Sequence, residues 1–254
     1  VDVRPVGAVS SALEGKHLAE LGAMAASDAQ VRYFSDDGKC VSDPVLMRRA
    51  LEYAKAFDGV VAQHAQDPRL TERAQMHEGD VSAELGLAGW PAVAEESIIA
   101  RDVLLAKHVG SKVHILHVST AGSVDLVRWA KAQGIAVTAE ATPHHLGLDH
   151  TEVRSYDPMF KVNPPLRPRE DVEALRRGVP VWMPGDAFGD LGDPGGPAGG
   201  DNLHEAVAGA TLRIGALTVR VSGGRHAEVH PTIPGPENRA YLIDERVLVT
   251  GDEH

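Results

Sequence analysis

Short apolar runs alternate with helical patterns over the first two-thirds of this 254-residue chain. Runs of about four to eight residues that are rich in β-branched side chains are typical of buried strands. Between these runs, apolar side chains recur at intervals of about three or four residues, as they do on one face of a helix. We therefore predict strands at residues 31–35, 59–64, 112–118 and 135–140, and helices from Pro44, from near Pro91 and over residues 122–133.

The sequence marks the start of the helix at Pro44. Asp43 is a suitable N-cap, and proline fits the first helical position. Alternation of strand and helix with short connections predicts parallel βαβ units, and hence either an α/β barrel or an open doubly wound sheet. The pattern contains about four such units, which is half of an eightfold barrel.

The pattern changes in the last third of the chain. Residues 185–201 contain seven glycines and show no apolar periodicity, which predicts a linker or loop. Beyond them, residues 210–214 with 217–221, and 240–243 with 247–250, predict two β-hairpins. The predicted organisation is a barrel portion followed by a Gly/Pro-rich linker or loop and a β-rich tail, at residues 1–178, 179–209 and 210–254.

Composition narrows the class of protein and its partners. The chain is 43% hydrophobic and 24% charged, values that are ordinary for a globular protein. No apolar run approaches the roughly 20 residues that a membrane-spanning helix requires. The single cysteine, Cys40, fits a reducing cytoplasm. A formal charge of −11 argues against nucleic acid or an anionic membrane as partner. We therefore predict a cytoplasmic protein that binds neither.

Among the 13 histidines, two fall at informative places. His64, His117 and also Asp37 stand at or just beyond the C-terminal ends of three predicted strands. In a barrel of parallel strands these ends converge on one rim, where active sites are built. Two imidazoles and a carboxylate suit zinc, although a histidine that ends an apolar strand can equally be a buried core residue. For His144 and His145, packing and hydrogen bonding around the site both remain open.

Six segments carry a family resemblance. They are FSDDGK (34–39), AQHAQD (62–67), MHEG (76–79), HVSTAGS (117–123), TAEATPHHL (138–146) and KVNPPLR (161–167). Together they resemble bacterial class I dihydroorotases, in that family's order and at about its spacing, over nearly all of residues 1–177. The resemblance implies a (β/α)₈ TIM-barrel amidohydrolase, here partial. Such an enzyme interconverts dihydroorotate and N-carbamoyl-aspartate in pyrimidine biosynthesis.

The resemblance also implies roles for individual residues. Asp37 would be a carboxylate ligand of one or two zinc ions, and would bridge them where two are bound. His64 and His117 would be imidazole ligands, and Asn163 would contact the substrate. Asp36 is expected to be a structural neighbour rather than a ligand. Zinc lowers the pKa of bound water to about 7 and polarises the amide carbonyl.

Some parts of the family pattern are missing from this sequence. It has no His-x-His pair with a nearby arginine, and no TDHAPH-like segment with the aspartate that serves as acid/base. No catalytic acid/base can therefore be assigned, and we expect dihydroorotase activity to be impaired. We also expect that the chain is either a chimaera or a sequence from which segments are absent.

The tail resembles a different family. Residues 212–254 are similar to the C-terminal half of a metallo-β-lactamase-fold hydrolase, which implies His226 and Asp252 as metal ligands. That family's His-x-His-x-Asp-His motif is missing. The alternatives are thus a metallo-β-lactamase-fold hydrolase or a non-catalytic structural partner of aspartate transcarbamoylase. Expected partners are a small cyclic amide, aspartate transcarbamoylase and further copies of the chain.

Overall fold

A computed structural model describes residues 5–178, 181–183, 203–205, 207–214, 217–225, 237–243 and 247–249. The chain divides into two compact units, Arg4–Leu175 and Arg176–His254 with Val1–Val3. Within the described residues, no helix combines the length and the apolar character that crossing a bilayer would require.

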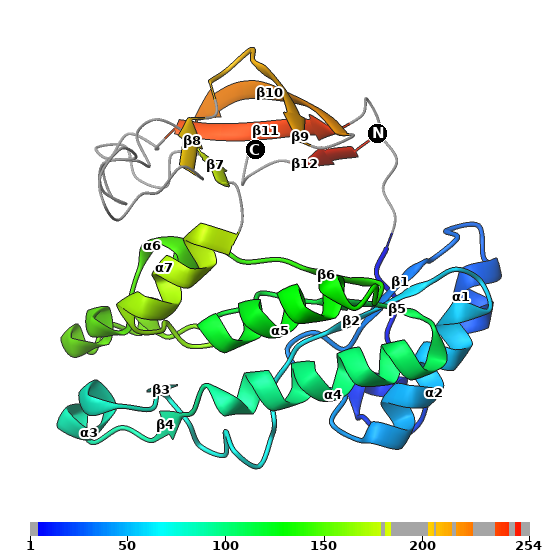
Figure 1. The fold of residues 1–254 in the computed structure, drawn as a ribbon, viewed down its shortest axis with the longest axis horizontal. Helices are drawn as coiled ribbons and strands as arrows, with labels where there is room; N and C mark the ends of the chain where they lie inside the picture. Colours follow the sequence, from blue (N-terminus) through cyan, green and yellow to red (C-terminus); the bar gives the residue numbers. More distant parts are fainter. Residues whose placement is uncertain are drawn as a thin grey trace. The chain divides into compact units, whose positions relative to one another are not determined.

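The N-terminal unit is built on a parallel sheet of four strands (Figure 1). These are β1 (Tyr33–Ser35), β2 (Val60–Gln63), β5 (Lys112–Ile115) and β6 (Val137–Ala139). Each strand lies beside its predecessor, in the order β1-β2-β5-β6. A doubly wound sheet would reverse its order at a switch point. The sequential order therefore identifies part of an α/β barrel, and it decides between the two architectures that the sequence left open.

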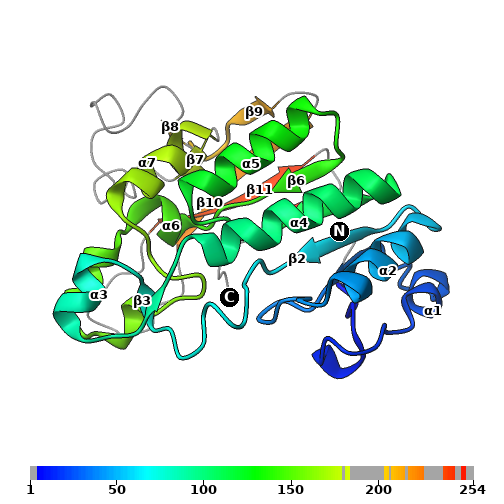
Figure 2. The same ribbon diagram turned by 60° about the horizontal axis from the view of Figure 1, so that its bottom comes forward.

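Three helices cover this sheet and contribute to its core. They are α2 (Pro44–Lys55), α4 (Val93–Val109) and α5 (Ala121–Ala132), and α4 contacts both of the others (Figure 2). The core between helices and sheet contains buried side chains of both. Those of the helices include Met47, Leu51, Ile99 and Val103, and those of the strands include Phe34, Val61, Val113 and Ile115. Each such side chain stabilises the fold by about 1.5–3 kcal/mol through removal of apolar surface from water.

The cap predicted at the start of α2 is formed, and a glycine follows the end of α5. Asp43 Oδ1 accepts a hydrogen bond from the backbone N–H of Leu46 at 2.7 Å, and Pro44 occupies the first turn of α2. After α5, Gly134 has a φ of +71°, which glycine adopts without steric cost. The four predicted strands are all present but shorter. The strand predicted at 112–118 ends at Ile115 because His117 turns out of the extended conformation, with a φ of +33°.

One excursion from the barrel pattern was not predicted. Between β2 and α4 the chain forms β3 (Met76–His77), α3 (Asp80–Leu85) and β4 (Gly89–Trp90), and the two strands pair in parallel. These elements are too short to show a periodic pattern in the sequence. The other elements in order are η1 (Ser11–Leu13), α1 (Leu21–Ala26), α6 (Pro143–Gly147), η2 (His150–Ser155), η3 (Pro158–Phe160) and α7 (Arg169–Gly178).

The C-terminal unit contains an antiparallel sheet in the order β12-β11-β10-β9. Its strands are β9 (Thr211–Ile214), β10 (Leu217–Arg225), β11 (Glu237–Ile243) and β12 (Val247–Val249). Both predicted hairpins are formed, with Ile214 opposite Leu217 and Ile243 opposite Val247. A parallel pair, β7 (Val181–Met183) with β8 (Leu203–Glu205), lies within the range predicted as linker or loop. The apolar run of β7 is short and is followed by many glycines, so the composition of the region predicted a linker and the strand was missed.

Candidate metal centre

Three neighbouring strands bring Asp37, His64 and His117 to one edge of the sheet. His64 directly follows β2, His117 follows β5, and Asp37 lies in the turn after β1. The Nδ1 atom of His64 is 2.9 Å from Nε2 of His117, and Asp37 Oδ1 is 3.3 Å from each of these nitrogens. Around a four-coordinate zinc with bonds of about 2.0–2.1 Å, ligand atoms lie roughly 3.3 Å apart. The donor set and its spacing therefore fit a metal ion of this kind.

The two adjacent aspartates have different surroundings. Asp36 is buried and accepts hydrogen bonds from the backbone N–H groups of Val9 at 2.9 Å and Ser10 at 3.0 Å. The Asp37 side chain is 60% exposed and accepts from the N–H of Gly38 at 2.7 Å. Gly38 has a φ of +82°, so the turn that aims Asp37 at the histidines favours glycine at this position. Asp36 is structural, as the sequence suggested.

The electrostatics favour the protonation states that metal binding needs. Burial alone would raise the pKa of the Asp37 carboxyl, but the Gly38 N–H and His117 together hold it below its ordinary value. Burial lowers the pKa of His64. An ionised carboxylate and a neutral imidazole are the forms that bind a metal ion. The charge distribution thus agrees with the geometry.

The backbone at His117 is held in an uncommon conformation. A φ of +33° lies in the left-handed region, which costs a non-glycine residue about 1–3 kcal/mol. Two residues later, the N–H of Ser119 donates to Glu95 Oε1 at 2.9 Å, and Thr120 caps α5 by accepting from the N–H of Ser123. The fixed segment after His117 therefore maintains the turn that points its ring at His64.

A buried charge pair supports this segment. Glu95 and Arg167 are 2% and 1% exposed, and Arg167 Nη2 lies 3.6 Å from Glu95 Oε2. Arg167 also donates to Ser119 Oγ at 3.0 Å, to the carbonyl of Trp90 at 3.0 Å and to Nδ1 of His77 at 3.1 Å. The pair ties the VNPPLR segment to the loop after β5. Sequence reasoning missed Glu95, because an acidic residue in the first turn of a helix is usually solvent-exposed.

The VNPPLR segment reaches the metal centre at Asn163. Asn163 Nδ2 is 3.5 Å from Gln66 Oε1, and this same oxygen is 2.8 Å from Nε2 of His64. His145 is buried and hydrogen-bonds through Nε2 to the carbonyl of Pro164 at 3.0 Å. Of the two roles that the sequence left open for His145, the structure therefore shows hydrogen bonding. The structure thus brings Asn163 to within two hydrogen bonds of a predicted ligand.

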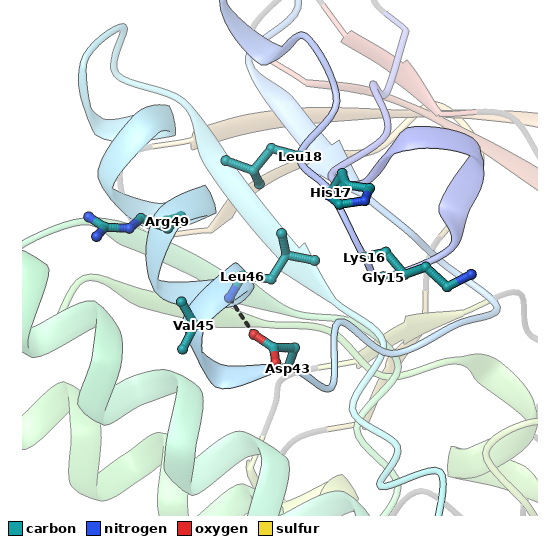
Figure 3. Close-up of a pocket in the computed structure, with 8 residues that line it drawn as sticks. All are labelled: Gly15, Lys16, His17, Leu18, Asp43, Val45, Leu46 and Arg49. Carbon is teal, nitrogen blue, oxygen red and sulfur yellow. Dashed lines mark hydrogen bonds between the residues drawn. The ribbon is translucent and has the colours of Figure 1, made fainter.

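The tail ligands predicted from the sequence and one surface hollow complete the set of candidate sites. His226 and Asp252, the predicted ligands in the tail, lie outside the described residues. An open hollow of about 650 Å³ lies beside the start of α2 and is lined by Lys16, His17 and Arg49, among others (Figure 3). Asp43, also in its wall, is engaged as the helix cap. None of the three predicted ligands lines this hollow.

Comparison with solved structures identifies the fold. The L-hydantoinase (dihydropyrimidinase) from Arthrobacter aurescens superimposes with a TM-score of 0.54 at 24% identity, over 69% of this chain and 40% of that chain. D-hydantoinase from Bacillus sp. AR9 gives 0.54 at 22% identity, over 68% and 39%. At these identities the likeness shows the fold alone, which is part of a TIM barrel.

Sequence comparison then identifies relatives of the N-terminal segment. Residues 1–123 match the family model for dihydro-orotase-like proteins. Dihydroorotase from Leifsonia xyli is 75% identical over 177 residues, and that from Streptomyces coelicolor is 72% identical over 178; each match covers 70% of this chain. The N-terminal segment of the chain is thus dihydroorotase-like in sequence. It spans 40–42% of the length of these relatives. The comparisons give no support to the resemblance of the tail to a metallo-β-lactamase-fold hydrolase.

Proposed function

We propose that this chain supplies the Asp37–His64–His117 zinc site of a cyclic amidohydrolase. The proposed reaction is the interconversion of dihydroorotate and N-carbamoyl-aspartate in pyrimidine biosynthesis. The observation that carries the proposal is the spacing of 2.9 to 3.3 Å among one carboxylate oxygen and two imidazole nitrogens from successive strand ends. The names of the relatives that share the N-terminal sequence support the choice of reaction.

The roles of the side chains follow from their positions. A bound zinc ion would supply hydroxide at neutral pH and polarise the amide carbonyl. Asp37, His64 and His117 would hold the ion, and three protein ligands leave a fourth position open, as in catalytic zinc sites. Asn163, an exposed residue of the VNPPLR segment next to Gln66, would donate its amide N–H to a substrate oxygen.

Weak turnover is part of the proposal. The sequence contains neither a His-x-His pair nor a TDHAPH-like segment, which in the resemblance provide further ligands and the acid/base. Proton transfer to the leaving nitrogen needs a positioned acid, whose loss typically costs about 10²–10⁴-fold in rate. A bound metal with slow catalysis is therefore the expected behaviour of the chain.

The test uses the full 254-residue chain. Its zinc content after purification and its rate of dihydroorotate hydrolysis are compared with those of Asp37→Ala. The control is Asp28→Ala, since Asp28 is an exposed residue of the turn after α1. Zinc and activity that are present in the wild type and the control but lost in Asp37→Ala support the proposal. A chain that holds no zinc and ignores added zinc contradicts it, and would favour a structural role beside aspartate transcarbamoylase.

A further inference from the structure

The two ring nitrogens of His64 point to different partners. Nδ1 faces the metal centre, 2.9 Å from His117 Nε2 and 3.3 Å from Asp37 Oδ1. Nε2 points away from it and lies 2.8 Å from Oε1 of Gln66. The His64 ring is 2% exposed, so these contacts are sheltered from water. The side chain of Gln66 therefore determines whether Nε2 of His64 donates or accepts a hydrogen bond.

A chain of donors fixes the orientation of the Gln66 amide. The hydroxyl of Thr71 donates its single proton to the backbone carbonyl of Asp67 at 2.8 Å. Thr71 Oγ1 can then only accept from Gln66, at 2.8 Å, so the amide NH₂ of Gln66 faces Thr71. The amide oxygen consequently faces His64, and because this oxygen only accepts, His64 must carry its proton on Nε2. The lone pair of a neutral His64 is thereby left on Nδ1, facing Asp37 and His117.

We propose that Gln66 is a positioning residue of the metal centre, with Thr71 as its support. It holds His64 as the Nε2–H tautomer and so presents Nδ1 to the ion. The inference rests on the proposed function, since it assumes that Asp37, His64 and His117 hold a metal ion. Partners of this kind fix ring orientation and increase ligand basicity, and their loss typically costs about 10–100-fold in metal affinity. Gln66 also faces Asn163 through the same oxygen, which links the substrate loop to the ligand.

The experiment is a titration of the metal-free full chain with Co²⁺, followed by its visible absorption. We expect Gln66→Leu to weaken binding about 10–100-fold, because leucine cannot accept the Nε2 proton. Gln66→Glu should bind at least as tightly as the wild type, since its carboxylate accepts that proton. Thr71→Val should fall between the wild type and Gln66→Leu, because the amide is then free to rotate. Gln75→Leu, at an exposed glutamine of the same connection, is the matched control.

The outcomes separate the inference from the proposed function. Co²⁺ binding that Asp37→Ala abolishes, but that is unchanged in both Gln66→Leu and Thr71→Val, overturns the role of Gln66 and leaves the metal site standing. A wild-type chain that does not bind Co²⁺ overturns the proposed function and this inference with it. Gln66→Glu and Thr71→Val decide the matter if Gln66→Leu does not fold. Thermal unfolding of the metal-free variants shows whether a loss of affinity arises from loss of structure.

Discussion

The carboxylate of Glu95 accepts the backbone N–H of Ser119 at 2.9 Å, two residues beyond His117. A residue in the first turn of α4 thus fixes the loop that follows β5. Its other partners include Ser123 Oγ at 2.6 Å and Arg167, which is equally buried. The geometry of a predicted metal ligand therefore depends on a helix that carries no ligand itself.

Replacement of Glu95 by glutamine tests this dependence. Glu95→Gln keeps the shape of the side chain but removes the negative charge that forms an ion pair with the buried guanidinium of Arg167. Removal of one partner from a buried ion pair typically costs about 3–5 kcal/mol. We expect a loss of this size in the free energy of unfolding, measured by urea denaturation. The exposed Glu72→Gln serves as control, and equal stability of the two variants would contradict a supporting role for the pair.

Acid should destabilise the N-terminal unit through one buried and one partly buried histidine. Burial lowers the pKa of His145 and of His77 to about 4 each, from an ordinary value of about 6.5. Between these values the unfolded chain binds more protons than the folded one, so the free energy of unfolding falls as pH falls. We expect His145 alone to account for up to about 3 kcal/mol between pH 6.5 and 4.

His145→Gln isolates this effect, because glutamine can still donate to the carbonyl of Pro164 without becoming charged. Its free energy of unfolding should depend less on pH than that of the wild type, when urea curves at pH 7 and pH 4.5 are compared. The exposed His108→Gln should retain the full wild-type dependence. Parallel pH profiles for the wild type and His145→Gln would show that this ring is not the sensitive group.

The backbone conformation of His117 should lower the stability of the metal-free chain, while its ring contributes to metal binding. Its φ of +33° is unfavourable for histidine, whereas asparagine tolerates the left-handed region better. His117→Asn should therefore leave the free energy of unfolding of the metal-free chain unchanged or raise it by up to about 1 kcal/mol. Co²⁺ binding should be lost. Thermal unfolding and Co²⁺ titration measure the two effects separately. A variant that is clearly less stable would argue against stored strain at this residue.

Metal should stabilise the fold by mass action. Zinc at a free concentration of about 100 times its dissociation constant should raise the free energy of unfolding by about 2.7 kcal/mol, if the unfolded chain does not bind it. Asp37→Ala should show little of this gain, and a chelator should reverse it in the wild type. Equal stabilisation of both chains by zinc would place the binding elsewhere.

The sequence predicted the parts of the site that depend on topology. Strand ends of parallel βαβ units meet at one edge, so the closeness of Asp37, His64 and His117 could be expected from their places in the pattern. Their role as ligands stays a prediction. Gln66 and Glu95 could not be found in this way, because their roles depend on which polar atoms become buried together. Residues far apart in the sequence, such as Glu95 and Arg167, meet only in the folded chain.

The fold was predictable to a similar extent. The strands and helices of the barrel portion have lengths at which hydrophobic periodicity is informative, and the two hairpins of the tail alternate clearly. The excursion from Met76 to Trp90 consists of elements too short for such a signal. The resemblance of the tail stays a prediction, because a short β-rich stretch with glycine turns has features that many unrelated β-proteins share.

The excursion formed by β3, α3 and β4 has an evolutionary consequence. It is inserted between a strand and the helix that returns from it, and its own two strands pair with each other rather than with the main sheet. Its fixed points toward the centre are the His77 ring and the Trp90 carbonyl, both acceptors for Arg167. Loops at this position can vary while the scaffold stays constant. A graft in place of this segment would have to retain these two acceptors and the contacts of Glu84 and Leu85 with Arg154 and Tyr156. Within those limits, the excursion is a place where selection can alter the surroundings of the site without changing the sheet.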